Sequence, residues 1–78
     1  MTWDIKNGKL VRDFAFSNFL EAISFVNKVA ELAEDADHHP DILIHDYKFV
    51  TVSLVSHDVS SITDKDHSLA EKIDALKK

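Results

Sequence analysis

The chain has 78 residues, of which 45% are hydrophobic, with one glycine, one proline and no cysteine. A chain of this length can build one core, so we predict a single domain over residues 1–78, without disulfides or thiolate metal sites. The net charge of −5 without a cluster of Lys or Arg argues against direct nucleic-acid binding, and no apolar run approaches the ~20 residues that span a bilayer. We therefore expect a cytoplasmic protein that binds neither nucleic acid nor membrane.

The first elements form a predicted β-hairpin. Asn7-Gly8 is a two-residue turn signal, because both residues tolerate the positive φ of a type I′ turn. This register places Ile5 opposite Leu10 and Trp3 opposite Arg12. Phe14 and Phe16 continue the same face of the second strand.

Helical spacing follows over residues 18–35, where Asn18 and Glu21 have the spacing of a capping box. We predict that the buried stripe of this helix consists of Phe19, Ala22, Ile23, Val26, Val29, Ala30 and Ala33.

Two further strands are predicted after Pro40, at residues 42–45 and 47–56. Thr63 and Asp66 then mark the start of a last helix. The apolar side chains of that helix are Leu69, Ala70, Ile73 and Leu76. The order β-β-α-β-β-α favours an α+β fold, a two-layer sandwich in which a four-stranded antiparallel sheet carries both helices on one face.

Alternation along the last strand assigns Val50, Val52 and Leu54 to the core. Phe49 and Val55 then lie on the opposite face of the sheet, among polar residues. That face is either a contact or ligand surface, or it simply carries two isolated apolar side chains.

The histidines at element boundaries are the candidates for chemistry. His38 and His39 follow the central helix and His57 ends the last strand, whereas His45 and His67 fit surface positions. Imidazoles beside a carboxylate such as Glu34 can act as general acid and base near neutral pH. From the residues alone, such a site and a plain polar loop stopped by proline are both open.

Two other chemistries fit less well. His38 and His39 are neighbours in extended chain and point in opposite directions, so they do not easily bind one zinc ion. Ser56, His57 and Asp58 have the residue types of a nucleophilic triad, but consecutive side chains cannot adopt the relay geometry.

The spacing of seven residues resembles a family signature. They are Glu34, His38, His39, Pro40, Tyr47, His57 and Asp66. The pattern is similar to that of the pterin-4a-carbinolamine dehydratases, and the similarity extends from Trp3 nearly to Leu76. The resemblance implies removal of water from 4a-hydroxytetrahydropterin to give quinonoid dihydropterin, without metal or bound cofactor, in a homodimer or homotetramer. A vertebrate member is also a transcriptional coactivator, so a non-catalytic, protein-binding oligomer of the same fold is the alternative.

The resemblance also implies which residues act. The catalytic histidines correspond to His38, His39 and His57. The substrate-binding residues correspond to Glu34, Asp37, His38, His39, Pro40, Ser56, His57, Asp58 and Val59. We expect His38 and His57 to exchange protons, while His39 holds the pterin and Glu34 orients a ring.

The sequence departs from the family pattern in three places. One is a spacing that the pattern tolerates, six residues rather than five between Pro40 and Tyr47. Ser60-Ser61 replaces a usual glycine pair, which would cost about 1 kcal/mol if one of these residues has positive φ. The sequence given starts at the strand of Trp3, where many members have an additional helix, so any assembly contact made by that helix is in question.

Overall fold

The computed structural model describes residues 3–76, so residues 1–2 and 77–78 of the predicted domain lie outside the described part. The elements are β1 (Asp4–Lys6), β2 (Lys9–Ala15), α1 (Phe19–Ala36), β3 (Asp41–His45), β4 (Phe49–Leu54) and α2 (Asp64–Leu76). The predicted order β-β-α-β-β-α is confirmed. Neither helix in residues 3–76 combines the length and apolar character needed to cross a membrane.

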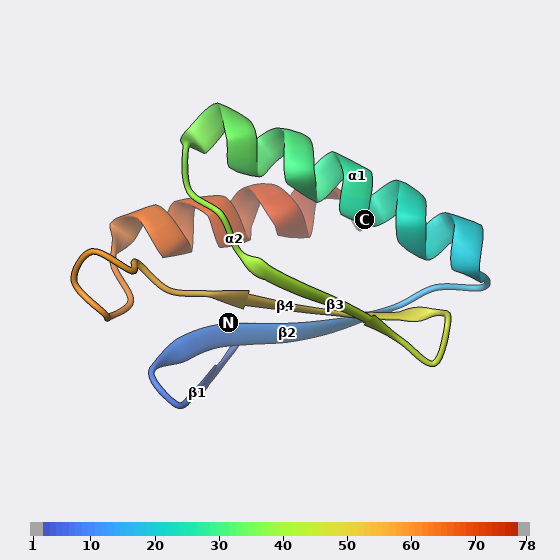
Figure 1. Ribbon diagram of the computed structural model, residues 1–78, viewed down its shortest axis with the longest axis horizontal. Helices are drawn as coiled ribbons and strands as arrows, with labels where there is room; N and C mark the ends of the chain where they lie inside the picture. The colour runs from blue at the N-terminus through green and yellow to red at the C-terminus, as the bar shows by residue number, and fades with distance from the viewer. Residues whose placement is uncertain (1–2, 77–78) are drawn as a thin grey trace.

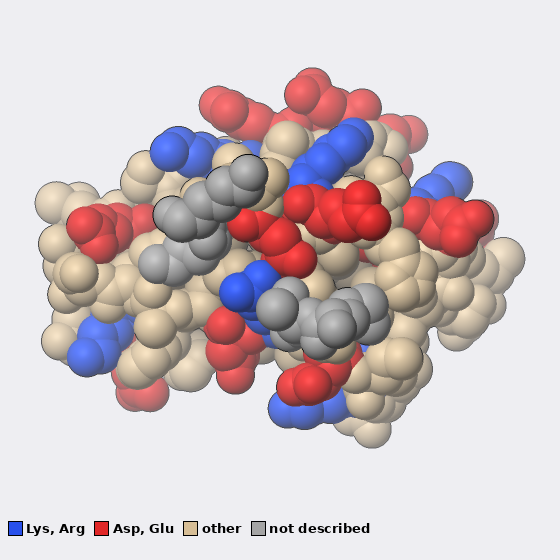
Figure 2. Space-filling view, turned by 180° about the vertical axis from the view of Figure 1, so that it is seen from behind, with Lys and Arg blue, Asp and Glu red and all other residues tan. Residues whose placement is uncertain are grey.

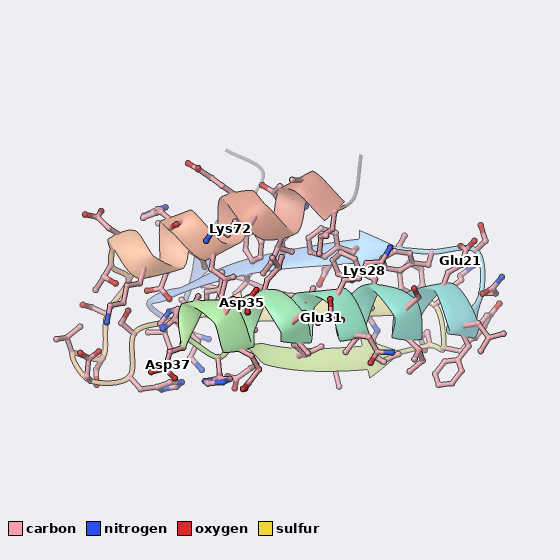
Figure 3. The ribbon with its side chains drawn as sticks, turned by 90° about the horizontal axis from the view of Figure 1, so that it is seen from above. Glu21, Lys28, Glu31, Asp35, Asp37 and Lys72 are labelled. Atoms are coloured by element: carbon pink, nitrogen blue, oxygen red, sulfur yellow. The ribbon has the colours of Figure 1, made fainter. Side chains whose placement is uncertain are left out.

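The sheet is antiparallel throughout, with the strand order β1-β2-β4-β3. Both helices cover one face of this sheet and leave the other face open (Figure 1), and they run side by side when seen from above (Figure 3). The predicted two-layer α+β sandwich is therefore confirmed. Acidic and basic side chains are interspersed on the face shown in Figure 2, without a patch of one sign.

The first hairpin has the predicted turn. Asn7 and Gly8 have φ values of 52° and 75°, and Ile5 pairs with Leu10. The predicted pairing of Trp3 with Arg12 is wrong as a ladder pair, because the β1–β2 ladder ends at Asp4 and Val11. Trp3 and Arg12 instead bind the same carboxylate on α2: the indole N–H of Trp3 donates to Asp74 Oδ1 at 2.9 Å, and Arg12 forms an ion pair with that oxygen.

Helix α1 begins at its predicted cap. Asn18 Oδ1 accepts the N–H of Glu21 at 2.9 Å, whereas Glu21 Oε1 accepts the N–H of Ser17 at 3.0 Å rather than that of Asn18. The capping box is thus closed one residue earlier than in its usual form.

The buried stripe of α1 is rotated from the predicted one. It consists of Ala22, Phe25, Val29 and Ala33. The prediction omitted Phe25, whose ring lies 4.7 Å from that of Phe14 and 5.0 Å from that of Phe16. Phe19 and Ala30 were wrongly included and are exposed. These two aromatic partners, one on β2 and one directly after it, determine which side of the helix is covered.

Strand β4 supplies the predicted core residues Val50, Val52 and Leu54, which have no exposed surface. The assignment of Val55 to the open face is wrong, because the strand ends at Leu54 and Val55 is 9% exposed. Alternation holds only while the backbone remains extended. Phe49, by contrast, is half-buried on the open face.

The turn after β4 contains the predicted strain at the serine pair. Ser56 and Ser61 form an isolated antiparallel β-bridge that closes the turn, and Ser60 has φ 53°. A non-glycine residue is disfavoured at such a φ.

We therefore expect Ser60→Gly to raise the free energy of unfolding by about 1 kcal/mol. Urea denaturation followed by the fluorescence of buried Trp3 would measure the change. Ser61→Gly is the matched control, because Ser61 lacks a positive φ and glycine there should not stabilise. Equal effects of the two substitutions would show that the strain is not at Ser60.

Candidate active site

The loop after α1 and the turn after β4 lie at the same end of the molecule. In Figures 1 and 3 both segments lie beyond the C-terminal end of α1, which Asp37 marks in Figure 3, next to the start of α2. The predicted residues 37–40 and 56–59 therefore come from two segments that are far apart in sequence and lie side by side.

The end of α1 directs the first of these segments. Asp37 adopts the left-handed conformation with φ 50° and ψ 43°. Its N–H donates to Glu34 O, and the N–H of His38 donates to Ala33 O, each at 3.1 Å. This is a Schellman motif, which ends the helix and reverses the chain. Asp37 itself is exposed, and His38 comes next with its side chain only 11% exposed.

His38 binds a buried carboxylate on α2. Its Nε2 lies 2.5 Å from Asp66 Oδ1, and Asp66 has no exposed surface. The other oxygen, Oδ2, accepts the hydroxyl of Ser56 and the backbone N–H of Thr63, both at 2.9 Å. Because a carboxylate only accepts, His38 must donate from Nε2, and its Nδ1 is the ring atom that can exchange a proton with a substrate.

The hydrogen bonds of Asp66 keep it ionised. Burial by itself disfavours the charged carboxylate, but the bonds from His38, Thr63 and Ser56, together with the charge of His38, outweigh burial and lower the pKa of Asp66. An ionised Asp66 accepts the hydrogen bond from His38 Nε2 and fixes the orientation of the imidazole ring. This pair therefore has the composition of a histidine acid/base group oriented by a carboxylate.

His39 and Glu34 form a second, separate pair. His39 Nε2 lies 2.7 Å from Glu34 Oε1, and the two side chains are 59% and 76% exposed. Adjacent histidines thus bind acids on different helices, one inside and one at the surface.

The remaining predicted residues have different environments. Pro40 is half-buried, and His57, Asp58 and Val59 are exposed on the turn. A cavity of about 240 Å³ lies beside this turn, lined by Ser56, Asp58, Val59, Thr63, Asp64 and Lys65. Ser56 is only 2% exposed, so its hydroxyl supports Asp66 rather than facing solvent.

Asp66 is the residue that the sequence prediction left out of the site. It appeared there as the last position of the signature and as a helix start, and the structure shows that one side chain serves two purposes: Oδ2 caps α2 at Thr63 while Oδ1 holds His38. Tyr47, another signature position, lies at the far tip of the β3–β4 hairpin and is 60% exposed. Within residues 3–76 there is no group of three or more potential ligands placed to hold a metal ion.

Comparison with known proteins identifies the family. A family profile described as pterin 4 alpha carbinolamine dehydratase matches residues 1–76. The chain belongs to the pterin-4a-carbinolamine dehydratase family. Proteins provisionally named as pterin-4-alpha-carbinolamine dehydratases in Picosynechococcus sp. and Thermomicrobium roseum are 53% and 49% identical over 74 residues. These matches cover 95% of this chain and 79% and 78% of the two relatives.

Solved structures of pterin dehydratase-like proteins have the same fold. A transcriptional coactivator/pterin dehydratase from Brucella melitensis superposes with a TM-score of 0.89 at 31% identity, covering 96% of this chain and 81% of the other. A pterin dehydratase-like protein identified as a RuBisCO assembly factor of the alpha-carboxysome superposes with a TM-score of 0.80 at 23% identity, covering 97% of this chain and 89% of the other. The second likeness is informative for the fold alone.

Proposed function

We propose that the protein dehydrates 4a-hydroxytetrahydropterin to quinonoid dihydropterin. Membership of the dehydratase family supports the substrate class, and the observation that carries the chemistry is His38 held by buried, ionised Asp66. An imidazole with one nitrogen fixed on a carboxylate can accept and return a proton at the other.

The elimination needs two proton transfers. The C4a–O bond breaks as the departing oxygen is protonated, a ring nitrogen loses a proton, and a C=N bond forms as water leaves. We propose that His38 and His57 share these transfers, which His38 can perform through Nδ1. Only proton transfers are required, so we propose that the reaction uses no resident cofactor or metal.

The substrate-holding residues are proposed from the second pair and the turn. His39, oriented by Glu34, stands at the surface where a pterin can approach. Asp58 and Val59 line the cavity next to the turn. Ser56 and Asp37 then act as positioning residues, the first on Asp66 and the second through the end of α1.

A coupled assay tests the proposed activity. A phenylalanine hydroxylase generates the carbinolamine, and the appearance of quinonoid dihydropterin is followed with and without the protein. We expect the protein to accelerate its formation in proportion to protein concentration. A spontaneous rate in the presence of folded protein would refute the activity.

A non-catalytic binding function is the second candidate. It is favoured by the name of the structural relative from Brucella melitensis, a transcriptional coactivator/pterin dehydratase at 31% identity. This function predicts a specific protein partner whose binding is unchanged by His38→Ala. The dehydratase function predicts instead that His38→Ala removes the activity whether or not a partner binds. The cytoplasmic location remains a prediction, which cell fractionation would test.

Self-association is proposed through strand β3, which is an edge of the sheet with Leu43 59% exposed. Its sequence, DILIH, is complementary to itself: antiparallel pairing with a second copy about Leu43 places Ile42 opposite Ile44 and Asp41 opposite His45. An edge strand with an apolar centre and with a carboxylate and an imidazole at its ends favours an isologous homodimer.

Leu43→Lys should therefore convert a dimer to a monomer, because a lysine on an edge strand opposes pairing of edges. Light scattering during size-exclusion chromatography would measure the molar mass. Leu20→Lys, on α1, is the control, since Leu20 is 78% exposed and should leave the mass unchanged. A wild-type protein that remains monomeric at high concentration would contradict the proposal.

A further inference from the structure

We propose that a cavity on the open face of the sheet binds a compact organic cation, an alkylammonium or guanidinium group. The cavity has a volume of about 320 Å³ and is lined by Asp13, Phe14, Ala15, His45, Asp46 and Phe49. Its lining residues come from the end of β2, the β3–β4 turn and the strand residues beside that turn, at the opposite end of the molecule from the loop that follows α1 (Figure 1). The dehydratase chemistry makes no use of these side chains.

A hydrogen-bond chain fixes the orientation of His45. The hydroxyl of Thr51 donates to Asp13 Oδ1 at 2.6 Å, and Thr51 Oγ1 lies 3.1 Å from His45 Nε2. Because the single hydroxyl proton is used on Asp13, the proton of the second bond must come from Nε2. In the neutral ring Nδ1 is then an acceptor.

This acceptor faces a second acceptor. His45 Nδ1 lies 3.4 Å from Asp46 Oδ2. With Nε2 protonated, a lone pair of the neutral ring meets a carboxylate oxygen, an arrangement that calls for a donor between them. Either a second proton on the ring or an N–H group of a ligand provides that donor. A cation with several N–H groups can serve Nδ1, Asp46 and Asp13 together.

The aromatic wall suits the same ligand class. The rings of His45 and Phe49 are stacked with centroids 5.7 Å apart and an interplanar angle of 24°. Lys48 Nζ lies 5.5 Å from the centroid of Phe49, so the ring already accepts a cation from its own chain. Ala15 pairs with Phe49 across β2 and β4, and its small side chain leaves room beside the ring.

The charge of the cavity also favours a cation. Asp13 and Asp46 give the cavity two negative charges against the one positive charge of Lys48, in a chain of net charge −5. The ligand is either a free amine or the side chain of an Arg or Lys on a partner protein. Both present the same donors to the cavity.

Nuclear magnetic resonance titration of the full chain tests the inference. The probes are benzylammonium for a free amine and N-acetyl-arginine methylamide for a protein side chain, and benzyl alcohol is the neutral control. We expect saturable shifts of the ring nitrogens of His45 and the amides around Phe49, with either cation and not with the alcohol. A response to the arginine probe alone would assign the site to a partner side chain, and a response to benzylammonium shows that a free amine suffices.

Two variants separate the cavity from general charge attraction. Asp13→Asn should weaken binding about tenfold by removing a charge-assisted acceptor. Thr51→Val should also weaken it by releasing the orientation of His45. Asp4→Asn removes the same charge from an exposed position on β1 and should leave affinity unchanged. Absence of saturable shifts with both cations, or equal weakening by Asp4→Asn and Asp13→Asn, would overturn the inference.

Discussion

Replacing His38 with alanine should lower the rate of carbinolamine dehydration by roughly 10²- to 10⁴-fold, the usual contribution of a general acid or base. The expected loss follows from the position of His38, which is the one predicted catalytic histidine bound to a buried, ionised carboxylate. The measurement is the coupled hydroxylase assay at saturating substrate.

Two further variants show whether the loss of rate comes from the missing proton transfer or from a loss of stability. His38→Gln keeps an amide that can donate to Asp66, so it should preserve more stability than His38→Ala while remaining equally inactive. His67→Ala removes an exposed histidine from the first turn of α2 and should retain full activity. Full activity in His38→Gln would show that His38 exchanges no proton with the substrate.

Replacing Asp66 with asparagine should lower the free energy of unfolding by about 3 kcal/mol, because it replaces charge-assisted hydrogen bonds with weaker ones and turns an NH₂ group toward a donor. Three donors converge on this carboxylate, from His38, Ser56 and Thr63. The fluorescence of Trp3, which is 3% exposed, would report unfolding in urea.

The same residue makes stability depend on acid. Because the folded pKa of Asp66 is lowered below its ordinary value of about 3.9, its contribution is complete above that value and is lost as the pH falls toward the folded pKa. The wild type should therefore lose stability below about pH 4 more steeply than Asp66→Asn does. Glu71→Gln, which removes an exposed carboxylate from α2, should retain the wild-type acid dependence. Equal acid dependence of the wild type and Asp66→Asn would contradict the assigned role.

The sheet, both helices and their order could be predicted because they depend on local patterns. The Asn7-Gly8 turn, the Asn18 cap and the alternation of Val50, Val52 and Leu54 each require only a few neighbouring residues. The errors came where packing between elements decides. Phe25 fits the helical spacing between Ala22 and Val29 as well as Val26 does, and the rings of Phe14 on β2 and Phe16 in the loop after it decide that Phe25 is the more deeply buried.

The residues of the candidate site were predicted only in part, because packing between elements also decides the environment of each side chain. The signature identified His38 and His39. It could not indicate that His38 is buried and His39 exposed, because this depends on where α1 ends relative to α2. Asp66 was classified as a helix start, since nothing within α2 indicates that its second oxygen is bound by a histidine 28 positions earlier. Tyr47 shows the converse: its spacing in the signature did not bring it to the site.

A double-mutant cycle of His38 and Asp66 would show whether Asp66 acts on the dehydration through His38. The dehydration rate is measured for the wild type, His38→Ala, Asp66→Asn and the double variant, under conditions in which all four are folded. If Asp66 acts through His38, the wild type accelerates the reaction, Asp66→Asn slows it markedly, and the double variant is no slower than His38→Ala. A wild-type rate equal to the spontaneous rate, or effects that multiply in the double variant, would contradict the claim that an Asp66-held His38 dehydrates the pterin.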